Sequence, residues 1–180
     1  NAWIGTYDRG FVIAGKQSDY FNEDKNLSTP LEKKFVTRVI EDNHRNLWIA
    51  TRYDGLYRYL PSGILDKIDL SSVQPSGGDY LEGVFVDSQE RLWLAFEGRL
   101  CLATAIGHKA VGIASFPLDH VRCIKEDDAH TIWIGAWSGI YSYDKTTINP
   151  QRLDRTDIVN ISDILPLKDG RILFSAYAWD

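Results

Sequence analysis

The chain has 180 residues, a formal net charge of −5 and no methionine. Hydrophobic residues make up 44% of it and charged residues 25%, which are ordinary proportions for a soluble globular protein. No apolar run approaches the roughly 20 residues that a membrane-spanning helix needs. Acidic and basic residues are interspersed, which argues against nucleic-acid binding because that function calls for a concentrated basic face.

A tryptophan-centred motif recurs at even spacing. Residues 40–51, 85–96 and 125–136 align with one another, and in each an Asp stands six residues before a Trp flanked by aliphatic residues. Partial copies lie at both ends. The anchor positions are Trp3, Trp48, Trp93, Trp133 and Leu173, separated by steps of 45, 45, 40 and 40 residues. Self-similarity at such a period indicates a repeat architecture.

Each copy predicts short strands rather than helices, because its apolar runs are brief, rich in β-branched and aromatic residues, and bounded by turn residues. A partial unit is expected over residues 1–34. Within the first complete unit, strands are expected over residues 36–42, 47–51, 56–59 and 64–70, with a tight hairpin between the first two. Asp and Asn suit the backbone of such a hairpin. The three complete units are predicted over about 35–80, 81–120 and 121–157, with a partial unit over 158–180.

Four strands in each 40–45-residue unit indicate an all-β fold of propeller blades. The chain opens on Trp3 without a lead-in and ends just after an equivalent strand, so we expect an excerpt of about four blades. These would form an open arc of a larger ring, and their uncovered apolar faces would favour self-association. The anchors Trp3, Trp48, Trp93, Trp133 and Leu173 are expected in the core between blades.

The first complete copy is similar to the two-component regulator propeller repeat. The matching residues are Asp42, Leu47-Trp48-Ile49-Ala50-Thr51 and Gly55-Leu56-Tyr57-Arg58-Tyr59, and residues 125–144 match nearly as well. The resemblance implies a seven-bladed ring in the periplasmic sensor region of a bacterial hybrid two-component system. It also implies that the ligand is an oligosaccharide, that a histidine kinase lies elsewhere in the parent protein, and that only the parent contacts the membrane.

The chain departs from the family at one turn position. The family favours Gly three residues before the Trp, whereas Arg45, Glu90 and His130 stand there in this chain. Only Gly170 keeps the family residue, in the copy that has lost its Trp.

The loops between the second and third strands of each unit are the candidate binding site, because loops on a rigid scaffold often carry function. Each places an aromatic ring beside polar residues, an arrangement suited to stacking on sugar rings and bonding hydroxyls. The alternative is that these aromatics pack against the next blade. The candidate ligand contacts are Tyr7, Arg9, Arg52, Tyr53, Asp54, Glu97, Trp137, Tyr177 and Trp179, of which Tyr7, Tyr53 and Trp137 are the strongest.

No catalytic or metal-binding pattern is apparent, so no cofactor is expected. The histidines lack metal-ligand spacing. Because Asp42, Asp87 and Asp127 recur in every good copy, we interpret them as turn caps rather than as an active site. Cys101 and Cys123 are expected as small buried hydrophobes, and a disulfide between them is left open.

The leading hypothesis is therefore a non-catalytic, periplasmic, oligosaccharide-sensing segment that signals to a kinase. A scaffold for protein contact or dimerisation is the alternative. A propeller lyase or hydrolase is a third reading.

Overall fold

The chain folds into antiparallel β-sheets, as the repeat predicts. The computed structural model describes residues 2–5, 11–14, 30–74, 80–145, 147–150 and 159–177. In these residues the strands form five sheets in which neighbouring strands follow the order of the sequence. No helix in this part of the chain is long and apolar enough to cross a bilayer.

The sheets correspond to the repeat units. The first sheet consists of β1 (Ala2–Gly5) and β2 (Phe11–Ala14). The second consists of β3 (Val36–Glu41), β4 (Leu47–Thr51), β5 (Gly55–Tyr59) and β6 (Leu65–Ile68). The third consists of β7 (Leu81–Val86), β8 (Leu92–Phe96), β9 (Arg99–Ile106) and β10 (Lys109–Phe116). The fourth consists of β11 (Cys123–Glu126), β12 (Ile132–Ala136), β13 (Gly139–Tyr143) and β14 (Ile148–Pro150). The fifth consists of β15 (Val159–Pro166) and β16 (Ile172–Tyr177).

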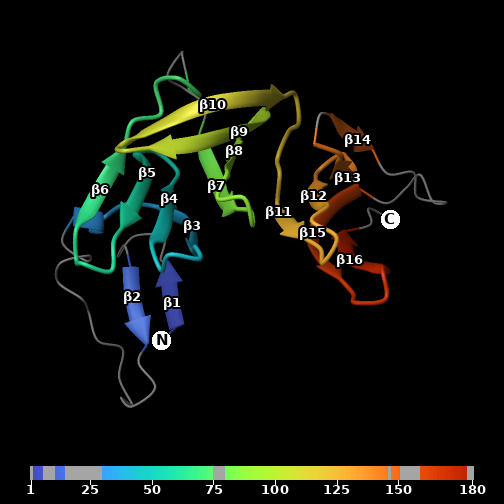
Figure 1. The fold of residues 1–180 in the computed structure, drawn as a ribbon, viewed down its shortest axis with the longest axis horizontal. Coiled ribbons are helices and arrows are strands. Elements are labelled where there is room, and N and C mark those ends of the chain that lie inside the picture. The colour runs from blue at the N-terminus through green and yellow to red at the C-terminus, as the bar shows by residue number, and fades with distance from the viewer. Residues whose placement is uncertain are drawn as a thin grey trace.

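The sheets stand side by side in an open arc, from the blue β1–β2 pair through the teal, green-to-yellow and orange sheets to the red β15–β16 pair (Figure 1). The first strand of each complete sheet faces the inside of the arc, where β3 contacts β7 and β11 contacts β15. This arrangement confirms the predicted arc of propeller blades. The size of the complete ring stays a prediction.

The hairpin between the first two strands has the same geometry in every described copy. In the second sheet, the backbone N–H of Arg45 donates to Asp42 O and the N–H of Asp42 donates to Asn46 O, both at 3.0 Å. Such a loop requires a left-handed residue at its third position. Arg45 occupies it with φ 64°, and the equivalent residues are Glu90 (62°), His130 (62°) and Gly170 (82°). The family's preference for Gly at this position therefore reflects backbone conformation.

The recurring Asp caps this hairpin, as predicted, and also holds the anchor. Asp42 Oδ1 accepts hydrogen bonds from the backbone N–H groups of His44 and Asn46, both at 2.9 Å. Its Oδ2 accepts the indole N–H of Trp48 at 2.8 Å. The pairs Asp87–Trp93 and Asp127–Trp133 repeat this bond at 2.9 and 2.8 Å. The six-residue spacing between the Asp and the Trp in the sequence therefore corresponds to a side-chain hydrogen bond in the structure.

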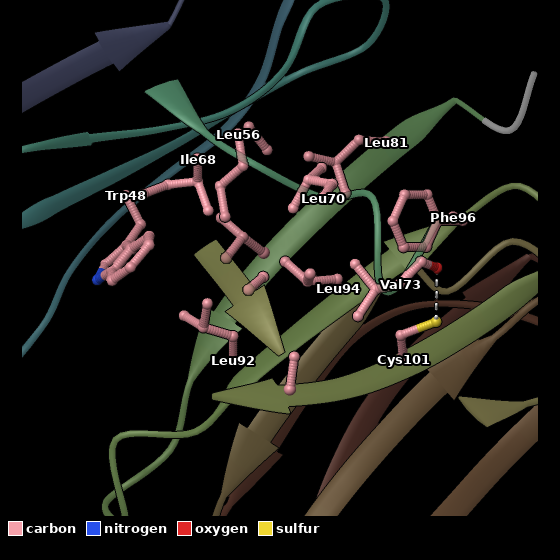
Figure 2. Packing of buried hydrophobic residues seen from close by; sticks show 14 residues of the cluster. Trp48, Leu56, Ile68, Leu70, Val73, Leu81, Leu92, Leu94, Phe96 and Cys101 are labelled. Carbon is pink, nitrogen blue, oxygen red and sulfur yellow. Dashed lines mark hydrogen bonds between the residues drawn. The ribbon is translucent and has the colours of Figure 1, made fainter. Parts of the chain in front are cut away.

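Apolar clusters fill the space between neighbouring sheets. Trp48, 4% exposed, lies in the cluster between the second and third sheets, which also contains Ile68 and Leu94 (Figure 2). Trp93 is fully buried in the next cluster, against Ile132 and Ile134 of β12.

The last two anchors are less buried than predicted. Trp133 is half-buried and packs against the cluster that contains Ile161. Leu173 is 52% exposed, so its assignment to the core is wrong for the described structure. Its strand β16 belongs to a two-stranded sheet, and no further described sheet covers the face on which it lies. The side chain of Trp3 lies outside the described residues.

The two cysteines are buried and free, as predicted for small hydrophobes. Cys101 belongs to the cluster of Figure 2, where its Sγ lies 3.8 Å from Val73 O, whereas Cys123 belongs to the cluster around Ile161. They form no disulfide. Burial raises the pKa of Cys123 to about 11.

The β9–β10 hairpin reaches back over the preceding sheet, which the sequence did not indicate. Its tip pairs with the end of β6, because the N–H of Asp69 donates to His108 O at 2.7 Å and the N–H of Ala110 donates to Asp69 O at 3.0 Å. Arg58 Nη2 also donates to Gly107 O at 3.0 Å. These contacts join the second and third sheets at their outer edges.

Candidate ligand-binding site

A cavity of about 560 Å³ opens on the inside of the arc, and we call it the central mouth. The residues that line this cavity occupy equivalent positions in successive repeat units. The residue eleven positions before each anchor lines it in four successive units, and these residues are Thr37, Glu82, Arg122 and Ser162. The first strand of each sheet is the innermost, so it presents the same register position to the mouth each time.

The predicted loop residues provide the rest of the wall. The residue four positions after the anchor lines the mouth in three units, and these residues are Arg52, Trp137 and Tyr177. Trp137 is 40% exposed and Tyr177 64% exposed, so both rings are accessible. Glu97, at the same position of the third unit, is exposed and does not line the mouth. Its carbonyl accepts the N–H of His120 at 3.1 Å.

Two residues of unusual backbone conformation also line the mouth. His120 has φ 45° and Asn160 has φ 54°, although neither is glycine, and both stand thirteen positions before their anchors. Strain of this kind clusters at functional sites. The N–H of Asn160 donates to Trp137 O at 2.7 Å, which ties β15 to the loop of the preceding sheet.

The side chain of Asn160 carries a buried atom without a partner. Asn160 is 7% exposed, and its Oδ1 accepts no hydrogen bond from any described residue. Buried polar atoms are nearly always satisfied, so an orphan that lines a cavity requires an explanation. A donor group of a ligand would supply the missing bond.

The polar groups of the mouth are organised around Trp137. The Arg122 guanidinium carbon lies 6.0 Å from the centre of its ring, and the His120 ring centre lies 5.8 Å away. Arg38 reaches across from β3 and donates from Nη2 to Arg122 O at 2.8 Å. His120 Nδ1 lies 3.4 Å from Glu82 Oε1.

Tyr53 and Asp54 line a different cavity, of about 650 Å³, beside the second and third sheets. Tyr53 is 68% exposed, yet its ring meets that of Tyr80, the residue directly before β7 of the third sheet, edge to face with ring centres 5.1 Å apart. Arg52 stacks over both rings at 5.9 and 5.2 Å. Tyr53 therefore packs against the next blade, which is the alternative that the sequence left open.

The Asp54 carboxylate is already engaged. It accepts hydrogen bonds from Lys67 Nζ at 2.9 Å, from Lys34 Nζ and from the hydroxyl of Tyr57. Burial would raise the pKa of Asp54, but these three donors outweigh burial and hold it well below the ordinary value of 3.8. Burial, together with the same carboxylate, raises the pKa of the Tyr57 hydroxyl. Asp54 thus holds its loop against the sheet.

Among the predicted contacts, Arg52, Trp137 and Tyr177 come together. Tyr7, Arg9 and Trp179 lie outside the described residues. Sequence reasoning missed the lining residues in or just before the innermost strands, namely Thr37, Arg38, Glu82, His120, Arg122, Asn160 and Ser162. Aligning the repeats at the eleventh position before each anchor would have found four of them.

The described residues contain no group of three or more His, Cys, Asp or Glu side chains arranged to hold a metal ion. The mouth instead offers guanidinium groups, aromatic rings and an unsatisfied amide oxygen. These groups suit recognition of a polar ligand.

No model of a known protein family matches the chain, and no curated protein matches it. Solved structures do match it. Two are structures of the extracellular domain of BT4673 from B. thetaiotaomicron, described in one as a one-component and in the other as a hybrid two-component system, with TM-scores of 0.75 and 0.76 at 20% and 19% identity. A third is the extracellular domain of the hybrid two-component system BT3049 from the same organism, with a TM-score of 0.75 at 20% identity.

These matches cover 97–98% of this chain but only 24–25% of the matched chains. The chain therefore spans about a quarter of the length of the domains that it resembles. At this identity the likeness establishes the fold, which is that of a segment of these extracellular domains.

Proposed function

We propose that the chain is part of the periplasmic sensor region of a hybrid two-component system and that it binds an oligosaccharide, without catalysis, in the central mouth. The histidine kinase and the membrane anchor lie elsewhere in the parent protein. The fold likeness to extracellular domains of such systems supports the sensor role. The convergence of Arg52, Trp137 and Tyr177 on one cavity carries the proposal of a ligand site.

The chemistry of the mouth suits a sugar. The exposed rings of Trp137 and Tyr177 offer flat apolar faces to the C–H face of a pyranose. The orphan Oδ1 of Asn160 can accept a hydrogen bond from a sugar hydroxyl. Since lining residues come from four successive units, a bound ligand would bias how these units sit relative to one another.

Calorimetric titration of the full-length protein with a panel of oligosaccharides tests the proposal. We expect binding that Trp137→Ala weakens at least tenfold, because the substitution removes a central stacking surface. Ile106→Ala is the control, since it removes an exposed apolar side chain at the end of β9 that does not line the mouth. A folded protein that binds no oligosaccharide would refute the sensor assignment.

Contact between copies is the second candidate. Leu165 and Leu173, 58% and 52% exposed, lie on β15 and β16 as paired residues. Sedimentation velocity of the full-length protein with Leu173→Asp distinguishes the two functions. Loss of an oligomer with unchanged oligosaccharide binding would assign this face to self-association.

A further inference from the structure

The central mouth is positively charged although the chain is not. Three arginines line it, Arg38, Arg52 and Arg122, against one carboxylate, that of Glu82. The carboxylate lies 3.4 Å from His120 Nδ1. The formal net charge of the chain is −5, so this concentration of positive charge is local. A cleft lined by one sign of charge attracts ligands of the opposite sign.

The three guanidinium groups have no acidic partner in the described part of the chain. Arg38 donates to a backbone carbonyl, Arg52 stacks on aromatic rings, and Arg122 stacks on Trp137. Three other described arginines do pair with carboxylates, at 3.2 Å for Arg58–Asp66, 2.7 Å for Arg91–Asp87 and 2.7 Å for Arg171–Asp169. The mouth thus gathers three guanidinium groups that no described carboxylate neutralises.

Two buried polar atoms of the residues that line the mouth also lack a hydrogen-bond partner among the described residues. Nε of Arg52 is buried and has no acceptor among the described residues, whereas Oδ1 of Asn160 is buried and has no donor. An occupant that satisfies both atoms must present an acceptor to Arg52 and a donor to Asn160. A carboxylate or sulfate group supplies the first, and a sugar hydroxyl supplies the second.

We infer that the ligand of the central mouth is an acidic sugar, bearing a uronate carboxylate or a sulfate ester that Arg52 and Arg122 bind. The inference rests on the proposed function and names its ligand class. Arginine presents a planar fork of donors that matches the paired oxygens of a carboxylate or sulfate. The rings of Trp137 and Tyr177 then hold the sugar, and Asn160 fixes its orientation.

Matched pairs of ligands, titrated calorimetrically into the full-length protein, test the charge directly. One pair is trigalacturonate and its fully methyl-esterified form, which differ in charge on the same skeleton. The other is 6-sulfo-N-acetyllactosamine and unsulfated N-acetyllactosamine. We expect the charged member of one pair to bind at least tenfold more tightly than its neutral counterpart, and its affinity to fall as NaCl is raised. The pair that responds distinguishes carboxylate from sulfate.

Two arginine variants test the location. Arg122→Gln and Arg52→Gln should each weaken binding of the charged ligand by about 10- to 100-fold, as expected for loss of a charge-assisted hydrogen bond. Lys168→Gln is the matched control: it removes one positive charge from an exposed turn between β15 and β16 and should leave the affinity unchanged. Thermal unfolding of each variant confirms that it folds.

The failures can be told apart. If the neutral member of a pair binds as tightly as the charged one, or if both arginine variants bind normally while Trp137→Ala does not, the acidic ligand is wrong and the sensor stands. If no member of either pair binds to the folded protein while a neutral oligosaccharide of the panel does, the inference falls and the sensor stands. If nothing in the panel binds either, the proposed function falls, and the inference falls with it.

Discussion

The indole N–H of Trp93 donates to Oδ2 of Asp87 at 2.9 Å, and both residues are buried, at 0% and 1% exposed. The other oxygen of the same carboxylate accepts the backbone N–H groups of Gln89 and Arg91 at 3.0 and 2.9 Å. One carboxylate thus links the hairpin turn to the anchor between sheets. This link explains why the Asp and the Trp recur together at fixed spacing.

Asp87→Ala should lower the free energy of unfolding by about 3 kcal/mol, because it leaves the Trp93 indole N–H buried without an acceptor and removes the turn cap. Urea denaturation measures the change. Asp128→Ala, at an exposed turn position of the next unit, should change stability by less than about 0.5 kcal/mol. Equal effects of the two substitutions would contradict the structural role given to Asp87.

Arg45→Gly should leave the protein as stable or stabilise it by up to about 1 kcal/mol, since Arg45 holds φ 64° and glycine adopts that conformation without strain. Its ion pair with Glu41, at 3.8 Å on a side chain 83% exposed, contributes little. Arg45→Val should destabilise, because a β-branched residue resists positive φ. Thermal unfolding compares the two variants, and the reverse order of stability would show that the turn conformation is wrong.

Gly135→Ala should destabilise the protein by about 1–3 kcal/mol through overpacking. A Cβ at Gly135 would lie 2.6 Å from Cys123 Sγ and 2.7 Å from Ile161 Cγ2, where β12 packs against β15. Gly98→Ala is the control, because a Cβ there meets nothing within 4 Å. Unfolding midpoints in urea measure both, and a neutral Gly135→Ala would mean that the fourth and fifth sheets do not pack this closely.

Asp54→Asn should destabilise the protein at neutral pH and lose this effect in acid. Hydrogen bonds from Lys34, Lys67 and Tyr57 lower the pKa of Asp54 in the folded state below that of the unfolded chain, which is about 3.9. The carboxylate therefore stabilises the fold above that pH, and the contribution disappears as pH falls through the folded-state pKa. Urea denaturation from pH 7 to pH 2 should show a constant difference from the wild type above about pH 5 and a shrinking one below it. A difference that grows in acid would contradict the network.

The repeat, the strand pairing and the turn cap could be predicted from the sequence because each leaves a periodic mark. The Trp48 and Trp93 anchors are buried because sheets lie on both sides of them. Leu173 has the same periodicity but lacks that covering sheet, because it lies at an end of the described arc, where the sequence predicted an uncovered apolar face. The reach of β9–β10 onto Asp69 was also missed, since contacts between units depend on hairpin length rather than on residue type.

Part of the candidate site could be predicted from the sequence. Arg52, Trp137 and Tyr177 were predicted because the loop between the second and third strands of each unit places an aromatic ring beside polar residues. Arg122 and Asn160 were missed, because they stand in or just before innermost strands where polar residues look like ordinary strand edges. These two residues matter because they line the same cavity as residues from the neighbouring units. Recognising this from the sequence requires the register of four units at once.

A crystal structure of the full-length sensor with a bound acidic oligosaccharide tests the central claim most directly. The account predicts a sugar ring against Trp137 and Tyr177, a hydroxyl bonded to Asn160 Oδ1, and an acidic group on Arg52 and Arg122. A ligand bound elsewhere, with the central mouth empty, would contradict it.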